Sequence, residues 1–148
     1  LTTAKEWQET ININLNTAFN IGHAVTQNLK NCQLIFFSTA AAHIGLPNHE
    51  LISASKAGVE GMVRSAAKTY ARKNLRFNTV SPGMVDTPLT QSITKNDIVR
   101  KASEKMHALQ RIGKPKDISN MISFLINSEN DWITGQNFII DGGLSSTK

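Results

Sequence analysis

Cysteine and tyrosine are each present only once in this chain of 148 residues. The single cysteine, Cys32, excludes an intramolecular disulfide, and no group of Cys and His residues has the spacing of a metal site, so we expect no metal. No apolar run approaches the roughly 20 residues that cross a bilayer, and no basic segment followed by an apolar stretch opens the chain. We therefore expect a cytoplasmic protein in a reducing setting, without a membrane partner.

Acidic residues are outnumbered by basic ones, and the formal net charge is +5. A basic chain raises the question of nucleic acid, yet the basic residues are dispersed. The densest group is Arg64, Lys68 and Arg72, spaced by four along one expected helix face. It is either a solvated helix face or a site that attracts an acidic partner. No aromatic interleaving or recognition-helix pattern accompanies it, so we expect no nucleic-acid partner.

Apolar residues recur at helical spacing over about residues 4–28 and 51–73, and more weakly near 95–107. A further helix is expected to begin at Pro115, because proline suits the first position of a helix. The spacing of Thr3 and Glu6 indicates a capping box at the first helix. The residues expected to face the core from that helix are Ile11, Leu15, Ala18 and Phe19.

Short apolar runs predict strands over residues 33–37, 76–80 and 136–140. The second should end at Ser81-Pro82-Gly83, because proline cannot donate to a ladder. Strands that alternate with helices imply parallel crossovers, hence an α/β fold with helices on both faces of a sheet. The length fits one domain, 1–148. A start at Leu1 and a helix as the first element are typical of a fragment.

Three segments resemble the short-chain dehydrogenase/reductase family: Leu51–Gly58, Ser81–Pro88, and the end of the chain from Thr134-Gly135-Gln136 to Asp141-Gly142-Gly143. The resemblance covers nearly the whole chain and is closest to the β-ketoacyl-carrier-protein reductase branch. It implies a Rossmann-like doubly wound parallel sheet, of which this chain is the second half with about three strands and flanking helices. The family's glycine-rich turn, which holds the cofactor pyrophosphate, belongs to the first half.

The resemblance also implies a reaction, hydride transfer between NAD or NADP and a carbonyl or alcohol substrate. Asn14 matches the family asparagine that holds a water in a proton relay. Thr39 matches the hydroxyl residue that hydrogen-bonds the substrate carbonyl, although both hydroxyls at this strand end, Ser38 and Thr39, could simply cap the backbone. Lys56 matches the lysine that binds the nicotinamide ribose and lowers the pKa of a tyrosine one helical turn before it.

Two further segments take their expected roles from the same resemblance. Pro82, Gly83, Val85 and Thr87 lie in the segment whose backbone and hydroxyl groups hold the nicotinamide amide. Residues 89–110 match the variable substrate loop. In that loop Met106, His107 and Leu109 are either pocket residues or ordinary helix packing.

Where the family has its catalytic tyrosine, this chain has Ile52, four residues before Lys56. Isoleucine has no proton to move, and Tyr70 lies about five turns further along the same helix. His43 and His49, in the preceding loop, are the remaining candidates for a proton donor. The sequence therefore leaves two functions open, an oxidoreductase with impaired chemistry or a non-catalytic interaction protein of the same fold. In either case the resemblance implies a homo-oligomer, a dimer or tetramer.

Overall fold

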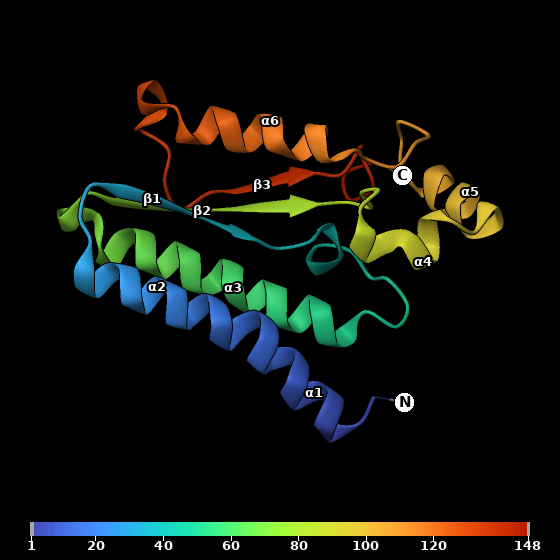
Figure 1. The fold of residues 1–148 in the computed structure, drawn as a ribbon, viewed down its shortest axis with the longest axis horizontal. Coiled ribbons are helices and arrows are strands. Elements are labelled where there is room, and N and C mark those ends of the chain that lie inside the picture. The colour runs from blue at the N-terminus through green and yellow to red at the C-terminus, as the bar shows by residue number, and fades with distance from the viewer. Residues whose placement is uncertain (1, 148) are drawn as a thin grey trace.

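The computed structural model describes residues 2–147, and its centre is a parallel sheet of three strands. The strands are β1 (Cys32–Phe37), β2 (Leu75–Pro82) and β3 (Asn137–Ile140), in the spatial order β1-β2-β3. Both pairs are parallel, so the carboxyl ends of all three strands meet at one edge of the sheet (Figure 1). The predicted α/β fold with a parallel sheet is confirmed.

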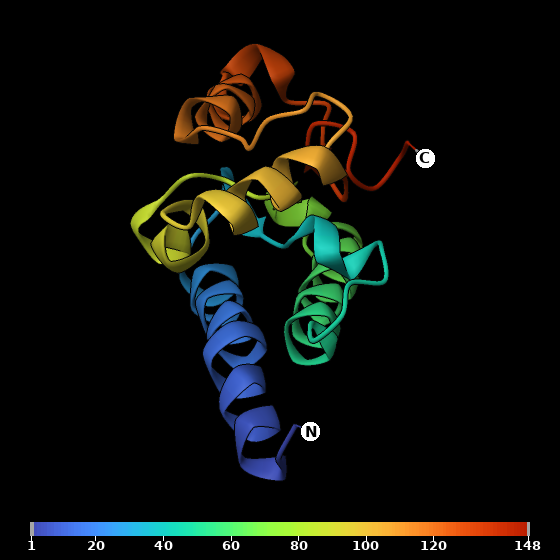
Figure 2. The ribbon, with the colours of Figure 1, turned by 90° about the vertical axis from the view of Figure 1, so that its right-hand side faces the viewer.

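The helices form a layer on each face of this sheet. They are α1 (Ala4–Ile11), α2 (Thr17–Asn28), α3 (Glu50–Thr69), α4 (Gln91–Thr94), α5 (Asp97–Met106) and α6 (Pro115–Ile126). Figures 1 and 2 show α2 and α3 on one side of the sheet and α6 on the other, with α4 and α5 beyond the carboxyl ends of the strands. None of the helices described is long and apolar enough to cross a membrane.

Alternating side chains of the strands divide the core in two. Leu34 and Phe36 of β1 pack towards α2 and α3, whereas Ile35 packs towards α6. The first cluster contains Ala18, Leu34, Phe36, Val59, Val63, Ala67, Leu75 and Phe77, and the second Val80, Val85, Ile118 and Leu125. Full burial stabilises the fold by about 1.5–3 kcal/mol for each large apolar side chain. The two clusters therefore fix α2 and α3 on one face of the sheet and α6 on the other.

A π-helical segment, Asn12–Asn16, interrupts the first predicted helix between α1 and α2. Such a segment inserts one residue and turns the following helix face by about 100°. The expectation that Phe19 faces the core is therefore wrong: its side chain is 56% exposed, and Ala18, Gly22 and Thr26 form the buried stripe instead. The predicted capping box is confirmed, because Glu6 N–H donates to Thr3 Oγ1 over 3.2 Å and Thr3 N–H donates to Glu6 Oε2 over 2.8 Å.

Two element ends differ from the sequence expectation. The helix expected over 51–73 ends at Thr69, and the chain turns through a short 3-10 segment to Asn74, whose φ is 54°. The second strand continues through Pro82 instead of ending at residue 80. Pro82 needs no N–H there, because the next ladder bond is donated by Gly83 to the carbonyl of Ile140 over 3.0 Å.

Candidate functional site

A cavity of about 520 Å³ lies at the carboxyl ends of the three strands. Four of its lining residues mark the strand ends: Thr39 follows β1, Pro82 ends β2, Gly83 follows it, and Leu144 follows β3. The remaining wall is largely apolar and comes from α4, α5 and the loop before α3, with Ile93, Val99, Met106 and Leu46. In open α/β sheets the crevice at this edge is where ligands bind.

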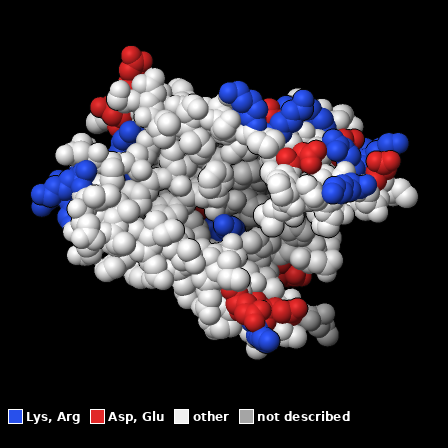
Figure 3. Space-filling view, in the orientation of Figure 1, with Lys and Arg blue, Asp and Glu red and all other residues white. Residues whose placement is uncertain are grey.

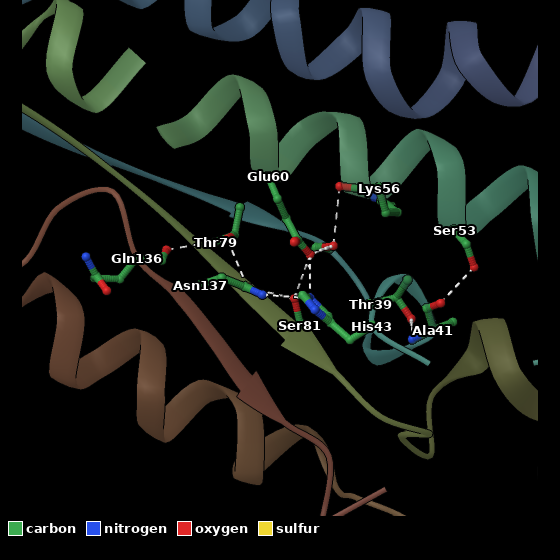
Figure 4. Close-up of polar contacts among 11 residues, drawn as sticks. Thr39, Ala41, His43, Ser53, Lys56, Glu60, Thr79, Ser81, Gln136 and Asn137 are labelled. Carbon is green, nitrogen blue, oxygen red and sulfur yellow. Dashed lines mark hydrogen bonds and ion pairs between the residues drawn. The ribbon is translucent and has the colours of Figure 1, made fainter. Parts of the chain in front are cut away.

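Thr39 presents a hydroxyl group to this cavity. Its backbone is extended, and its Oγ1 accepts a hydrogen bond from the N–H of Ala41 over 3.3 Å. The Ala41 carbonyl in turn accepts from the Ser53 hydroxyl of α3 over 2.8 Å, which ties this turn to the helix (Figure 4). Because Thr39 Oγ1 uses only a lone pair in its own turn, its proton is available for a ligand oxygen.

Lys56 reaches from α3 to the end of β1. Its Nζ donates to the carbonyl oxygen of Phe37 over 3.0 Å, two residues before Thr39. Burial lowers the pKa of the Lys56 ammonium, because desolvation disfavours its charged form. An ammonium has three N–H donors, so two remain for a ligand beside the strand end.

Behind Lys56, a cluster of polar side chains lies between α3 and the sheet, with Glu60, Ser38 and Ser81 buried and His43 at its exposed edge. Glu60 Oε1 accepts from the hydroxyls of Ser38 and Ser81 over 2.5 and 3.3 Å, and His43 Nε2 lies 2.9 Å away. Figure 4 shows Glu60, Ser81, Asn137 and His43 pointing towards one another from α3, β2, β3 and the turn after β1. One carboxylate thus joins the segments that carry Lys56 and Thr39.

The proton count within this cluster fixes the orientation of the Asn137 amide. His43 Nε2 must donate to the carboxylate of Glu60, so it cannot also accept from the Asn137 amide nitrogen 2.9 Å away. With the amide turned by 180°, its oxygen accepts from Nε2 and its nitrogen donates to the Ser81 and Thr79 hydroxyls, at 2.7 and 2.9 Å. Every donor in the cluster then has an acceptor.

The segment after β2 is held by its own backbone and hydroxyl groups. Val85 bridges to Gly113, and its carbonyl accepts from the Thr90 hydroxyl over 2.6 Å. Thr87 Oγ1 lies 3.2 Å from the same hydroxyl. Gly83 leaves no room for a side chain, since a Cβ there would lie 2.9 Å from the Asp141 Cα.

Asp141 anchors the turn that ends the chain beside Gly83. Its carboxylate accepts from the N–H groups of Gly143 and Ser145 over 2.9 and 2.8 Å. Desolvation pushes the pKa of Asp141 upwards, but hydrogen bonds from Ser145 and Gly143 outweigh it and leave the pKa below its ordinary value. The strand end and the turn are thereby fixed to each other.

A family model described as enoyl-(acyl carrier protein) reductase matches residues 1–145. The chain belongs to the short-chain dehydrogenase/reductase family. It is 35% identical to the 3-oxoacyl-[acyl-carrier-protein] reductase FabG of Thermotoga maritima over 143 residues, 95% of this chain and 57% of that protein. It is 32% identical to the human (3R)-3-hydroxyacyl-CoA dehydrogenase over 143 residues, 94% of this chain and 54% of that protein.

Solved structures of the same family superpose on the whole chain. A 4-hydroxyisoleucine dehydrogenase complexed with NADH has a TM-score of 0.94 at 26% identity, over 99% of this chain and 62% of that one. The chain thus spans little more than half the length of the curated relatives it matches. The sheet described above is the Rossmann-like sheet of short-chain dehydrogenase/reductases, as the resemblance implied.

The structure brings together only part of the predicted site. Thr39, Pro82 and Gly83 line the cavity, as do Met106 and His107 of the substrate loop. Leu109 lines a smaller neighbouring cavity of about 220 Å³ instead. The residues expected in the site that do not line the large cavity are Asn14, Ile52, Lys56, Val85 and Thr87.

Asn14 lies in the π-helical segment, where its Nδ2 donates to the Thr10 carbonyl over 3.1 Å. The neighbouring Leu15 approaches α3 closely, because a Cβ at Gly58 would lie 3.0 Å from a Leu15 methyl group. The segment therefore packs on the turn of α3 that follows Lys56. π-Helical segments occur often at functional sites.

Sequence reasoning missed the buried cluster around Glu60. The contacts that join its members span 17 to 94 residues of the chain, so no local spacing predicts them. The one available signal was Glu60 itself, a charged residue beside Val59 and Val63 on the buried side of α3. A carboxylate in such a position requires hydrogen-bond donors from elsewhere in the fold.

Proposed function

We propose that the protein containing this chain is an NAD- or NADP-dependent oxidoreductase that transfers a hydride between the nicotinamide and a carbonyl or alcohol substrate. The observation that carries the proposal is the apolar cavity at the strand ends, with the Thr39 hydroxyl in its wall. Lys56 stands beside the same strand end through its bond to Phe37. These residues offer a hydroxyl for the substrate oxygen and an ammonium for the cofactor.

The described residues fit the nicotinamide end of such a cofactor. The ammonium of Lys56 has two N–H donors left for ribose hydroxyls, and the segment around Val85 and Thr87 is rigidly held beside the cavity. A bound dihydronicotinamide supplies the hydride. The 4-hydroxyisoleucine dehydrogenase structure that superposes on this chain is complexed with NADH, which supports this assignment.

For the substrate, we propose a 3-oxoacyl or 3-hydroxyacyl thioester. By name, the Thermotoga maritima relative acts on a 3-oxoacyl carrier protein and the human relative on a 3-hydroxyacyl-CoA. The cavity wall of Ile93, Val99 and Met106 suits an aliphatic chain, because apolar surface buried against it is removed from water. Thr39 then donates to the oxo group, and Asn14 holds the relay water.

Proton transfer is the weak step in this site. A positioned acid or base typically contributes roughly 10²- to 10⁴-fold to such a reaction. Ile52 has no ionisable group, so the side chain that occupies the family's tyrosine position contributes nothing. We therefore propose that turnover is slow compared with relatives that have the tyrosine.

Deuteride transfer tests the proposal. The natural protein that contains this chain is incubated with NADH or NADPH deuterated at nicotinamide C4 and with the N-acetylcysteamine thioester of acetoacetate. Deuterium at C3 of the 3-hydroxy product supports the proposal, and Thr39→Val should reduce its rate by about tenfold or more. Thr69→Val, which changes an exposed hydroxyl at the end of α3, is the matched control and should leave the rate unchanged.

The second candidate function is a non-catalytic interaction protein. It is favoured by Ile52 and by large apolar side chains that α2 and the segment before it leave exposed, Ile13, Phe19 and Ile21. We propose that these side chains are covered in a homo-oligomer, a dimer or tetramer. Saturable NAD(P)H binding by the natural protein supports the oxidoreductase, and assembly without any cofactor binding supports the interaction protein.

A further inference from the structure

Three histidines lie near the carboxyl ends of the strands, and their hydrogen bonds separate them. His43 is engaged in the buried cluster, with Nε2 2.9 Å from Glu60 Oε1 and 2.9 Å from the Asn137 amide. It does not line the large cavity. His43 therefore donates to Glu60 and has a structural role. Of the two histidines that the sequence left open as proton donors, His43 is already engaged.

His107 lines the cavity, but both of its ring nitrogens are used. Nδ1 lies 2.7 Å from the Ser103 carbonyl oxygen and must carry a proton. Nε2 accepts from the N–H of Met84 over 3.3 Å. The residue is only 2% exposed, so this neutral ring serves as a clamp between α5 and the end of β2.

His49 stands at the start of α3 and lines the cavity together with Thr39. Its Nδ1 lies 2.7 Å from the carbonyl oxygen of Pro47. A carbonyl oxygen only accepts, so Nδ1 carries a proton and Nε2 is the nitrogen left for a ligand. Across residues 2–147, Nε2 of His49 has no hydrogen-bond partner.

Among the described residues, the cavity wall therefore contains two titratable side chains, His49 and His107, and of these only His49 has a free ring nitrogen. Few other charged groups lie near His49. Glu50 follows it at the exposed start of α3, Lys56 stands two turns further along the same helix, and His107 is the other titratable group of the wall. The chain thus supplies one proton donor to a cavity from which the family's tyrosine is missing.

We propose that His49 is a catalytic residue, the donor of the proton in carbonyl reduction at this site. The inference rests on the proposed function. The hydride adds to the carbonyl carbon and forms the new C–H bond, the electron pair of the C=O π bond moves to oxygen, and oxygen takes the proton from Nε2. The imidazolium of His49 becomes a neutral imidazole, and water restores its proton before the next turnover.

The geometry around Nδ1 supports this role. The bond to the Pro47 carbonyl fixes the ring orientation and the tautomer, as orienting groups do for catalytic histidines elsewhere. Thr39 holds the substrate oxygen by its hydroxyl, and Nε2 delivers the proton from another wall of the same cavity. The route passes through neither Ile52 nor Tyr70.

The test compares variants of the natural protein that contains this chain, with deuteride transfer to the acetoacetyl thioester as the activity. His49→Gln should slow the transfer by about 10²-fold, the scale of a positioned acid, and leave the affinity for NAD(P)H unchanged. His23→Gln, which changes an exposed histidine on α2, is the matched control and should behave like the unmodified protein. Transfer by His49→Gln within twofold of the unmodified protein overturns the inference while leaving the proposed function standing.

A double variant provides a second readout. In an Ile52→Tyr background, where a phenol can donate, His49→Gln should no longer slow the transfer. An equal loss of rate from His49→Gln in both backgrounds contradicts the inference.

A third readout does not depend on activity. Nitrogen-15 NMR of the histidine rings, without cofactor, should show the His49 Nε2 signal shift when the acetoacetyl thioester is added, while the His23 signals stay unchanged. An unmoved His49 signal at saturating thioester overturns the inference. If the unmodified protein transfers no deuteride at all, the proposed function fails together with the proton role, an outcome distinct from the others.

Discussion

The hydroxyl oxygen of Ser38 lies 2.5 Å from Oε1 of Glu60, across the interface between β1 and α3. Ser38 is the residue before Thr39, and Glu60 stands one helical turn after Lys56. The pair therefore fixes the strand end that lines the cavity relative to the helix turn that carries the ammonium. The hydrogen bond from Ser81 to the same carboxylate extends this connection to β2, and the contacts of Asn137 with Ser81 and His43 extend it to β3.

Removing the carboxylate should destabilise the fold strongly. Glu60→Ala leaves buried hydroxyls and the His43 ring without their acceptor, which should lower the free energy of unfolding by about 3–5 kcal/mol. Urea denaturation measures this value. Glu60→Gln, which keeps the shape and one acceptor oxygen, should cost less. Glu9→Ala, at an exposed position on α1, is the control and should stay within about 0.5 kcal/mol. A loss below about 1 kcal/mol for Glu60→Ala would contradict the assigned role.

The close approach of β2 to the final turn gives a matched pair of glycine variants. Gly83→Ala places a Cβ 2.9 Å from the Asp141 Cα, a backbone atom that cannot rotate away, so it should lower stability by about 1–3 kcal/mol. Gly45→Ala has no atom within 4 Å of the new Cβ and should be neutral or slightly stabilising. Equal midpoint temperatures of thermal unfolding for the two variants would contradict this expectation, because the strand end would then accommodate the added methyl group.

The main elements of the fold were predictable because their sequence patterns are local. The apolar run of β1 and the helical spacing of Val59, Val63 and Ala67 predict the elements that form one of the two core clusters. The position of Phe19 was not predictable, because the π-helical segment inserts its extra residue without any glycine or proline to mark it. β2 exceeded its expected end because a parallel ladder skips the N–H of Pro82.

The site residues that lie in family motifs could be predicted from the sequence. Those that depend on contacts between distant segments could not. Thr39, Pro82 and Gly83 stand in motifs that the family places at strand ends, and all three line the cavity. Nothing local distinguishes His43 from His49, six residues apart in one loop. Only the contacts of His43 with Glu60 and of His49 with Pro47 show which ring is occupied and which one faces the cavity.

The open edge of the sheet gives a prediction about association. Among the residues that the structure describes, β1 pairs only with β2, and Phe37 at its end is 50% exposed. Unpaired strand groups with apolar side chains recruit other strands, so the 148-residue chain by itself should self-associate. Sedimentation velocity over a wide concentration range measures this.

Phe37→Lys should reduce that association, because a charge on an edge strand opposes pairing. Leu89→Lys, which changes an exposed apolar residue away from β1, is the control and should leave it unchanged. A chain that stays monomeric at every concentration would contradict the prediction.

The measurement that tests the account most directly is the turnover of Ile52→Tyr in the natural protein that contains this chain. The variant restores a phenol one helical turn before Lys56, whose charge lowers the pKa of a neighbouring phenol. Deuteride transfer to the acetoacetyl thioester is the activity to be measured. We expect Ile52→Tyr to raise the rate by roughly 10²-fold or more over the unmodified protein, and Lys56→Ala in the same background to abolish the gain. An unchanged rate despite demonstrated cofactor binding would contradict the account.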